Sequence, residues 1–492
     1  MPPSDEIDKI EKRKICFCCV GEVYLKNEIR EHGRQRVCSY CDKNRRTYTI
    51  GEMVERIESA FKEHYVRTSD QPSPFEYSMT ANTEFKYDWT RNGEPVVSAI
   101  MEAAEIPEEA ASDIQEILAD KYYDFEAACL GEETEFSSDS YYIESSTTDE
   151  KWQNEWREFE RSLKTETRFF SRIASRLLSL AFDDIDKMQT SNGRSLVVDA
   201  GPKTSFVSFY RARNFQSDKA LKSALANPDK YVGPPPSSFA KAGRMNAHGI
   251  SVFYGANNPE AALAEVRPPV GSKVVIARFE IIRPIRLLDL TALDLVTTNG
   301  SIFDSTYIDR LERTMFLRNL SRRITIPVMP DDEPLVYLAT QAIADFLASE
   351  NTPSLDGILF PSVQTAGGAL NAVLFHKASR VESIELPSGT EISANLGSIT
   401  EEGWEDNYTV YEEVPQKIKN PVNKEPHVFL RIPEAQSNEE RPATLKIDLD
   451  SVCVHMVKAV NFETHNSSVR RHRFDKCQIS SSSYAVTQGF DF

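Results

Sequence analysis

Two pairs of cysteines near the start of the chain restrict what this region can fold into. Two residues separate Cys16 from Cys19, and two separate Cys38 from Cys41. A two-residue gap lets both thiolates of one turn reach the same ion, and four such ligands complete a tetrahedral zinc site. The spacing therefore predicts a small zinc-ribbon module over residues 1–48. Four protein ligands leave no open coordination position, so the role of this zinc is structural.

Cys18 stands inside the first pair and complicates the ligand set. The residues alone leave open whether it replaces Cys16 or Cys19 as a ligand or stays a free thiol. A small apolar cluster of reduced cysteines is the competing interpretation, but it does not account for two matched pairs. The eight cysteines do not form a disulfide framework, because the remaining three stand alone. These are Cys129, Cys453 and Cys477.

The whole chain is acidic and long enough for several domains. Its 492 residues, 40% of them hydrophobic, can bury a sizeable core in roughly two to four domains. The formal net charge of −18 argues against a chain that mainly coats nucleic acid, since phosphate binding requires clustered lysine and arginine. No apolar run approaches the ~20 residues that cross a bilayer, and the start lacks a secretory signal, so we expect a cytoplasmic protein without membrane contact.

The predicted zinc module is nevertheless locally basic. Such a surface can contact nucleic acid or an acidic partner, but a run of charge is more often a solvated face. Contact with nucleic acid is therefore the less favoured interpretation. The basic residues are Arg30, His32, Arg34, Arg36, Lys43, Arg45 and Arg46.

Helical periodicity dominates residues 49–195. Apolar residues recur at three and four positions in IGEMVERIESAFKEHY and again in WQNEWREFERSLKTETRFFSRIASRLL, which predicts an all-helical domain. The block resembles HEPN-like bundles, many of which cut RNA with an arginine and a histidine four to six residues apart. The nearest candidates, Arg56 and His64, are too far apart for that pattern. We therefore favour a structural or regulatory domain over a nuclease.

From Ser205 the pattern changes to mixed strands and helices. SFVSFYRARNF, KVVIARFEI, IRLLDLT, DGILFPSV and NAVLF are strand candidates, and EPLVYLATQAIADFLAS is a helix candidate. The strands follow one another too closely for regular β-α-β crossovers, so we expect an α+β domain over residues 200–400. An extension over residues 401–492 contains strand-like segments that either extend this sheet or form a small one, and beyond Ser480 a disordered tail is expected.

The segment Gly243–Pro268 concentrates polar residues on a predicted turn-strand-turn-helix unit. Alternation up to Tyr254 indicates a strand from Gly243 onward. Asn258 is a capping residue and Pro259 suits the first helical position, so a helix should begin at Pro259. Glu265 then shares a helix face with small alanines, which allow a ligand or another layer to come close.

Six motifs in this region occur in the order of a known family. They are FYRAR, GPPP, the segment AGRMN to ALAEVRP, Y.ATQAIADF, DGILFPS and NAVLF. The chain thus resembles the RES domain family, in the version preceded by a cysteine-rich and HEPN-like amino-terminal region. That resemblance implies a fold similar to ADP-ribosyltransferases and degradation of NAD+ by hydrolysis or phosphorolysis of the nicotinamide–ribose bond. It also implies a toxin or defence effector, with an antitoxin or regulatory protein as partner.

The residues that match the family motif each have a chemical rationale. Arginine suits the pyrophosphate of NAD+ because its guanidinium is planar and permanently charged. A carboxylate can hold ribose hydroxyls and stabilise the oxocarbenium-like sugar formed on cleavage. An aromatic ring can stack on the cofactor, and a serine can bond nicotinamide or ribose. The candidates are Arg211 and Arg244 for the phosphates, Glu265 for the sugar, Tyr254 for stacking and Ser362 for hydrogen bonding.

A second set of residues is expected to position the first. These are Arg213, Asn246, which we also count among the residues that bind the cofactor, and Arg267. No glycine-rich dinucleotide fingerprint is visible, so we do not expect a Rossmann mode of binding NAD+. Two further functions stay open: transfer of ADP-ribose onto a protein, and a catalytically silent module that senses a nucleotide.

Overall fold

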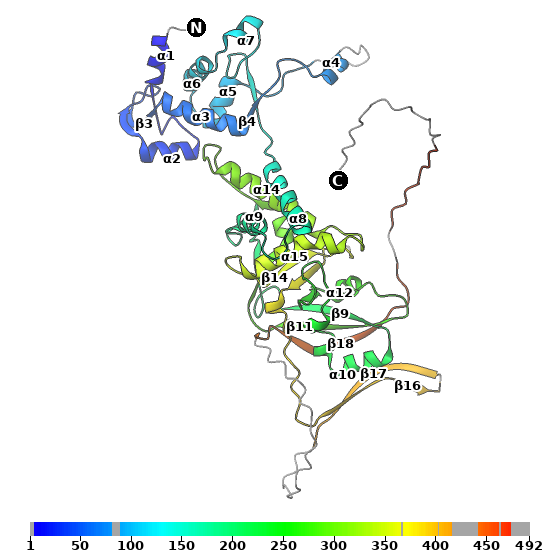
Figure 1. Ribbon diagram of the computed structural model, residues 1–492. Helices are drawn as coiled ribbons and strands as arrows, with labels where there is room; N and C mark the ends of the chain where they lie inside the picture. The colour runs from blue at the N-terminus through cyan, green and yellow to red at the C-terminus, as the bar shows by residue number, and fades with distance from the viewer. Residues whose placement is uncertain are drawn as a thin grey trace.

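The computed structural model describes residues 4–80, 89–365, 368–401, 403–415, 441–461 and 464–473 (Figure 1). Within these ranges the chain forms an amino-terminal unit of short strands and helices and a carboxy-terminal unit built on a large sheet. No helix of the described residues has the length and apolar character needed to cross a membrane.

The amino-terminal unit begins with a three-stranded antiparallel sheet in the order β1-β3-β2. Thr49 starts the following helix with a capping box, because its hydroxyl accepts from the Glu52 N–H at 3.2 Å while the Glu52 carboxylate accepts from the Thr49 N–H. The elements are α1 (Ser4–Glu11), β1 (Lys14–Cys16), α2 (Val23–His32), β2 (Arg34–Val37), β3 (Asn44–Thr49) and α3 (Ile50–His64).

Further helices and a second small sheet complete this unit. Ile15 and Leu25 pack in the same hydrophobic core as Ile100 and Ile114. The region expected as a separate zinc module over residues 1–48 therefore shares its core with the helices that follow. The added elements are β4 (Tyr65–Arg67), α4 (Pro74–Thr80), β5 (Glu94–Pro95), α5 (Val96–Ala104), α6 (Glu108–Lys121), α7 (Phe125–Leu130) and β6 (Tyr141–Glu144).

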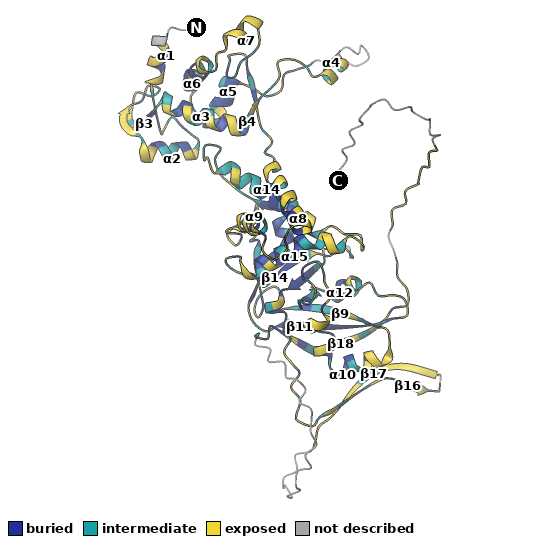
Figure 2. Ribbon diagram, viewed as in Figure 1, coloured by how far each residue is buried: buried dark blue, intermediate teal, exposed yellow. Residues whose placement is uncertain are grey.

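Helices α8 (Glu150–Thr165) and α9 (Arg172–Phe182) pack in a different core. Phe159 of α8 lies in one cluster with Leu288 and Phe316 from the carboxy-terminal unit. Figure 2 shows the buried sides of α8, α14 and α15 turned toward one another. The core thus changes between β6 and α8, and the expected end of the helical domain at residue 195 stays a prediction.

The carboxy-terminal unit is built on a sheet of eight strands, counted over the described residues, in the order β18-β11-β9-β10-β15-β14-β12-β8. β12 and β14 run parallel, and the other neighbours run antiparallel. This is the mixed α+β class that the sequence predicts. The strands are β8 (Val197–Ala200), β9 (Ser208–Phe215), β10 (Phe253–Ala256), β11 (Lys273–Ile281), β12 (Ile285–Asp289), β14 (Gly357–Pro361), β15 (Leu370–Leu374) and β18 (Leu445–Met456).

Successive side chains along each strand point to opposite faces of this sheet, and helices cover both faces. Ile358 and Val373 pack with α8, α9, α14 and α15, while Leu359 and Leu374 pack on the opposite face with α10. The helices are α10 (Asp218–Ala226), α11 (Pro228–Tyr231), η1 (Ser237–Phe239), α12 (Pro259–Glu265), α13 (Leu290–Leu293), α14 (Tyr307–Thr325), α15 (Glu333–Ser349) and η2 (His376–Ala378), and β7 (Gln189–Thr190) pairs with β13 (Val296–Thr297).

The carboxy-terminal extension contributes to the large sheet. β18 pairs antiparallel with β11, so the first of the two alternatives for this region is confirmed. A separate hairpin is formed by β16 (Glu391–Thr400) and β17 (Gly403–Glu413). The strand-like segment at 427–432 and the tail beyond Ser480 lie outside the described residues.

Candidate active site

A cleft is lined by α12, the last residue of α14, the first turns of α15 and strands β9, β10, β14 and β15 of the sheet. It consists of a cavity of about 100 Å³ against β9 and β10 and one of about 270 Å³ that reaches α14 and α15. Both are lined by Tyr254, Glu265, Phe360 and Asn371, so the two cavities adjoin one another. The cleft therefore brings together residues from four separate parts of the carboxy-terminal unit.

Tyr254 stands at the junction of the two cavities. Its hydroxyl donates to Asn246 Oδ1 at 3.0 Å and accepts from the Met245 N–H at 3.1 Å. Burial raises the pKa of Tyr254 to about 12, so the phenol is neutral at physiological pH. The two hydrogen bonds hold the ring in one place, and the hydroxyl proton is engaged by Asn246 Oδ1.

Asn246 organises the loop before β10. It is only 4% exposed, and its side-chain amide donates to the carbonyls of Lys241, Ala247 and Ile250 at 2.9–3.2 Å. These bonds replace a sheet ladder, so the strand predicted from Gly243 onward is wrong: it is shorter and spans Phe253–Ala256. Asn246 positions Tyr254, and its amide faces the loop.

Replacing Tyr254 by phenylalanine should destabilise the protein. Asn246 Oδ1 and the Met245 N–H lose their shared partner, which costs about 1–3 kcal/mol. Between pH 10 and 12 the unfolded tyrosine loses a proton that the folded one keeps, so the parent loses stability there and the variant does not. Urea unfolding at pH 8 and pH 11 checks both points. A stability difference between the two proteins that grew with pH would contradict this sign.

Arg244 borders the larger cavity and is clamped by the end of α14. Its Nη1 donates to the Ile324 carbonyl at 2.6 Å, and its Nη2 donates to the Ile326 carbonyl at 2.9 Å. The guanidinium also lies over the ring of Tyr337, 5.0 Å from its centroid. Both terminal nitrogens retain N–H groups beyond these bonds, so Arg244 is a fixed cation with donors left for an anionic ligand.

Glu265 is the last residue of α12, and the helix begins at Pro259 as predicted. The Asn258 side chain caps it by accepting from the Ala261 N–H at 2.8 Å. The exposed carboxylate of Glu265 lines both cavities and accepts from Asn371 Nδ2 at 3.1 Å. The helix thus ends with a charged group at the centre of the cleft.

Asn371 was not predicted as a site residue. It is 3% exposed, lines both cavities, and its Oδ1 has no hydrogen-bond partner among the described residues. A buried amide oxygen without a partner costs free energy, and a ligand with an N–H or O–H group would relieve it. The signal available in the sequence was its position at the start of the NAVLF strand, directly after a glycine turn.

Arg211 lies on β9. Its Nε donates to the Val232 carbonyl at 2.9 Å and its Nη1 to the Tyr254 carbonyl at 2.7 Å. Burial and, to a smaller extent, Arg213 lower the pKa of Arg211 to about 10, which leaves it charged at neutral pH. Within the described residues no carboxylate forms a salt bridge with it. Arg211 therefore adds uncompensated positive charge beside the smaller cavity.

Of the remaining predicted residues, only Arg267 lines the cleft. The Ser362 hydroxyl accepts from the Gln364 N–H at 3.3 Å and shapes the turn after β14, whose neighbours Pro361 and Val363 line the larger cavity. Arg213 is exposed and donates to the Tyr231 carbonyl at 2.7 Å. Arg267 is exposed and lines the larger cavity. Arg211 and Glu265 thus line the same cavity, whereas the structure places Ser362 in the lining of neither cavity, and only its neighbours reach the larger one.

Two models of known families match the chain. The model described as the RES domain matches residues 208–394, which contain the whole cleft. The model described as HEPN/RES N-terminal domain 1 matches residues 31–176. The chain contains a RES domain. Comparison with curated proteins and with solved structures gives no match.

In the described part of the HEPN/RES region, Arg56 and His64 do not come together as the arginine and histidine of a nuclease. Arg56 donates to both carboxylate oxygens of Glu28 at 2.8 and 2.6 Å. His64 is 6% exposed, and its ring lies against Tyr307, with centroids 5.9 Å apart. Because one side chain is paired and the other is buried, the two do not form a shared site.

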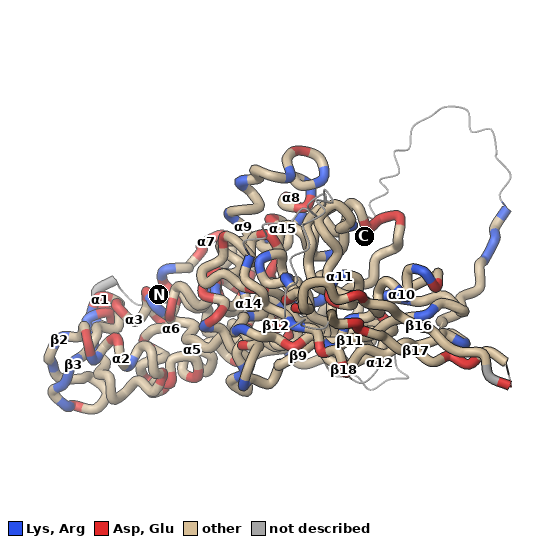
Figure 3. The backbone as a smooth tube through the Cα atoms, turned by 90° about the horizontal axis from the view of Figure 1, so that it is seen from below, with Lys and Arg blue, Asp and Glu red and all other residues tan. Residues whose placement is uncertain are grey.

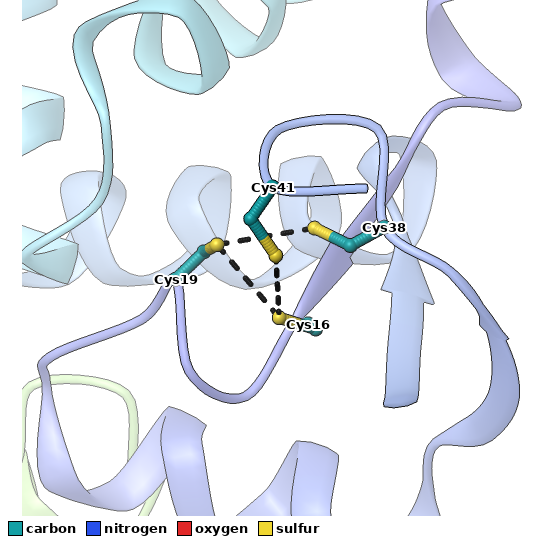
Figure 4. Close-up of side chains that lie close together, drawn as sticks. All are labelled: Cys16, Cys19, Cys38 and Cys41. Carbon is teal, nitrogen blue, oxygen red and sulfur yellow. Dashed lines mark hydrogen bonds between the residues drawn. The ribbon is translucent and has the colours of Figure 1, made fainter. Parts of the chain in front are cut away.

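Four cysteines come together in the amino-terminal unit (Figure 4). The Sγ atoms of Cys16, Cys19, Cys38 and Cys41 all lie within 4.8 Å of one another. Neighbouring sulfurs are 3.6–3.9 Å apart, and a tetrahedron with Zn–S bonds of about 2.3 Å has edges of about 3.8 Å. The donor set and its spacing therefore fit a tetrahedral zinc ion. Cys18 is exposed and contacts Arg45 instead.

The basic residues of this unit surround β2 and β3, as Figure 3 shows. Arg36 and Arg45 are directly paired across the two strands. Arg34 and Arg36 line a cavity of about 370 Å³ that also contains the acidic Glu52. Contact with nucleic acid stays a prediction, since the surface carries both signs of charge.

Proposed function

We propose that the cleft binds NAD+ and cleaves the bond between nicotinamide and ribose. The single observation that carries this proposal is the Glu265 carboxylate, held by Asn371 at the junction of two cavities. Arg244 borders one of these cavities and Arg211 the other. A carboxylate between two cationic ends suits a ligand whose reacting sugar lies beside a dianionic pyrophosphate.

The reaction follows from the charges of these groups. When the bond between the nicotinamide nitrogen and C1 of the ribose breaks, its electron pair leaves with nicotinamide. The ribose becomes an oxocarbenium-like cation, which the negative charge of Glu265 stabilises. An acceptor oxygen then bonds to C1 and releases its proton. Arg244 holds the pyrophosphate, and the unpaired Asn371 Oδ1 accepts from a ribose hydroxyl or the carboxamide.

The wider arrangement supports this proposal. We infer an ADP-ribosyltransferase-like arrangement of the sheet and a structural zinc ion in a ribbon-like module held by the four clustered cysteines. A closed site of four thiolates stabilises the amino-terminal unit and takes no part in the chemistry. Cleavage of NAD+ inside a cell would deplete a central cofactor. The protein would then act as a toxin or defence effector and would require an antitoxin or another regulatory protein.

NAD+ labelled in its adenosine moiety identifies the acceptor. Purified protein should convert it, in step with nicotinamide release, to ADP-ribose if water is the acceptor and to ADP-ribose phosphate if inorganic phosphate is. Label that remains on protein after denaturation would indicate ADP-ribose transfer instead. Binding of NAD+ without any loss would indicate a silent sensing module and would contradict cleavage.

A further inference from the structure

The longest described helix connects the two units of the protein. α14 begins at Tyr307 and ends at Thr325, a length of about 28 Å at 1.5 Å per residue. Figure 1 shows it running from the amino-terminal unit toward the sheet. A helix of this kind behaves as a stiff rod, so both of its ends move together.

The first end of α14 is anchored in the amino-terminal unit. Phe303, just before the helix, packs against the core that contains the cysteine-bearing sheet. Tyr307 lies against the buried ring of His64 at 5.9 Å. The connecting turn is braced, because the Asp304 carboxylate accepts from the Thr306 N–H at 3.0 Å and pairs with Arg310 at 2.8 Å. The contact is therefore made by an ordered turn.

The other end of α14 sets the position of Arg244. The Ile324 and Ile326 carbonyls accept hydrogen bonds from the two terminal nitrogens of its guanidinium. Thr325 and Pro327 line the larger cavity of the cleft. The backbone carbonyl of Arg244 is held separately by the Thr340 hydroxyl of α15. A movement of α14 relative to α15 would therefore turn the guanidinium while its backbone stayed in place.

We propose that Phe303 and Tyr307 are positioning residues for Arg244, acting through α14, so that the amino-terminal unit controls binding of the anionic part of the substrate. This inference rests on the proposed function. Neither residue reaches the cleft. Whatever changes the packing of the amino-terminal core, including the state of its cysteine cluster, is then transmitted to the pyrophosphate end of the site.

Substitutions at the anchored end test this coupling. Phe303→Ala and Tyr307→Ala should each raise KM for NAD+ about fivefold or more and leave kcat close to the parent value, because a binding contact is weakened. Tyr307→Phe keeps the ring against His64 and should behave as the parent. Phe125→Ala is the matched control, since that phenylalanine is exposed on α7. Unchanged KM in both alanine variants would overturn the proposal.

Hydrogen exchange separates this inference from the proposed function. In the two alanine variants, the backbone amides of residues 324–326 and of Val328 should exchange faster than in the parent, with unchanged helix content by circular dichroism. This readout needs no turnover. A parent that releases no nicotinamide contradicts the proposed function alone, whereas unchanged exchange at these amides contradicts the coupling even if the parent is fully active.

Discussion

Glu265→Gln should lower kcat/KM for NAD+ cleavage by a factor on the order of a hundred or more, the size of effect seen when a charge-stabilising group is removed. The glutamine keeps an oxygen that accepts from Asn371, so the hydrogen bond at 3.1 Å can persist while the negative charge is lost. The variant should fold and bind NAD+ like the parent, because the exposed carboxylate contributes little to packing. Nicotinamide release and calorimetric binding measure the two effects.

Glu260→Gln is the matched control for that experiment. Glu260 lies on the same short helix, in its first turn, and is exposed outside the cleft. Its charge interacts with the helix dipole and contributes only about 0.3–1 kcal/mol. This variant should turn over NAD+ at the parent rate. Equal losses in both variants would show that α12 was perturbed as a whole and that Glu265 has no special role.

Cys38→Ser should unfold much of the amino-terminal unit. Cys38 is fully buried, and its Sγ lies 3.9 Å from that of Cys19. Zinc bound to four such thiolates contributes on the order of 10 kcal/mol in small modules, comparable to the whole stability of a domain. The variant should contain less than one zinc per chain by atomic absorption and lose protease resistance before residue 141.

Substitution of a cysteine outside the cluster shows whether the loss of zinc and of protease resistance is specific to the cluster. Cys129 is exposed on α7 and distant from the cluster in the sequence, so Cys129→Ser should keep both zinc and protease resistance. Treatment of the parent with a strong chelator should reproduce the Cys38→Ser result. Metal-free protein that remained protease-resistant would contradict a structural ion.

Local patterns in the sequence predict much of the sheet and the start of α12. β9 is recognisable by its alternation, and β11, β14 and β15 are recognisable as short apolar runs because residues on both of their faces are buried. Asn258 and Pro259 mark a helix start by a mechanism confined to adjacent residues. Matched cysteine pairs likewise bring four sulfurs together. These predictions required no knowledge of distant contacts.

Features that depend on distant partners could not be predicted in this way. α14 was missed because arginines interrupt its apolar residues, while its buried Phe316 and Leu317 find partners on α8 and the sheet. The sequence of the loop before β10 alternates like that of a strand, but the buried side-chain amide of Asn246 donates hydrogen bonds to carbonyl groups of this loop. The sequence also does not show that α8 packs in the hydrophobic core of the carboxy-terminal unit and not in that of the preceding helices.

The site was predicted in part for the same reason. Glu265 and Tyr254 lie on one continuous segment, so the sequence already placed them close together. Asn371 joins them only because β15 pairs with β10 and brings Asn371 opposite Ala256. The carbonyls that clamp Arg244 come from the end of an unpredicted helix. Both features follow from the tertiary arrangement.

Nicotinamide release from NAD+ by the purified protein is the most direct test of NAD+ cleavage in this cleft. The parent should release one nicotinamide for each NAD+ consumed, and Arg244→Ala, which removes the clamped cation, should raise KM by at least tenfold. Absence of nicotinamide with and without phosphate, or an Arg244→Ala variant with the parent KM, would contradict the assignment of this cleft to NAD+.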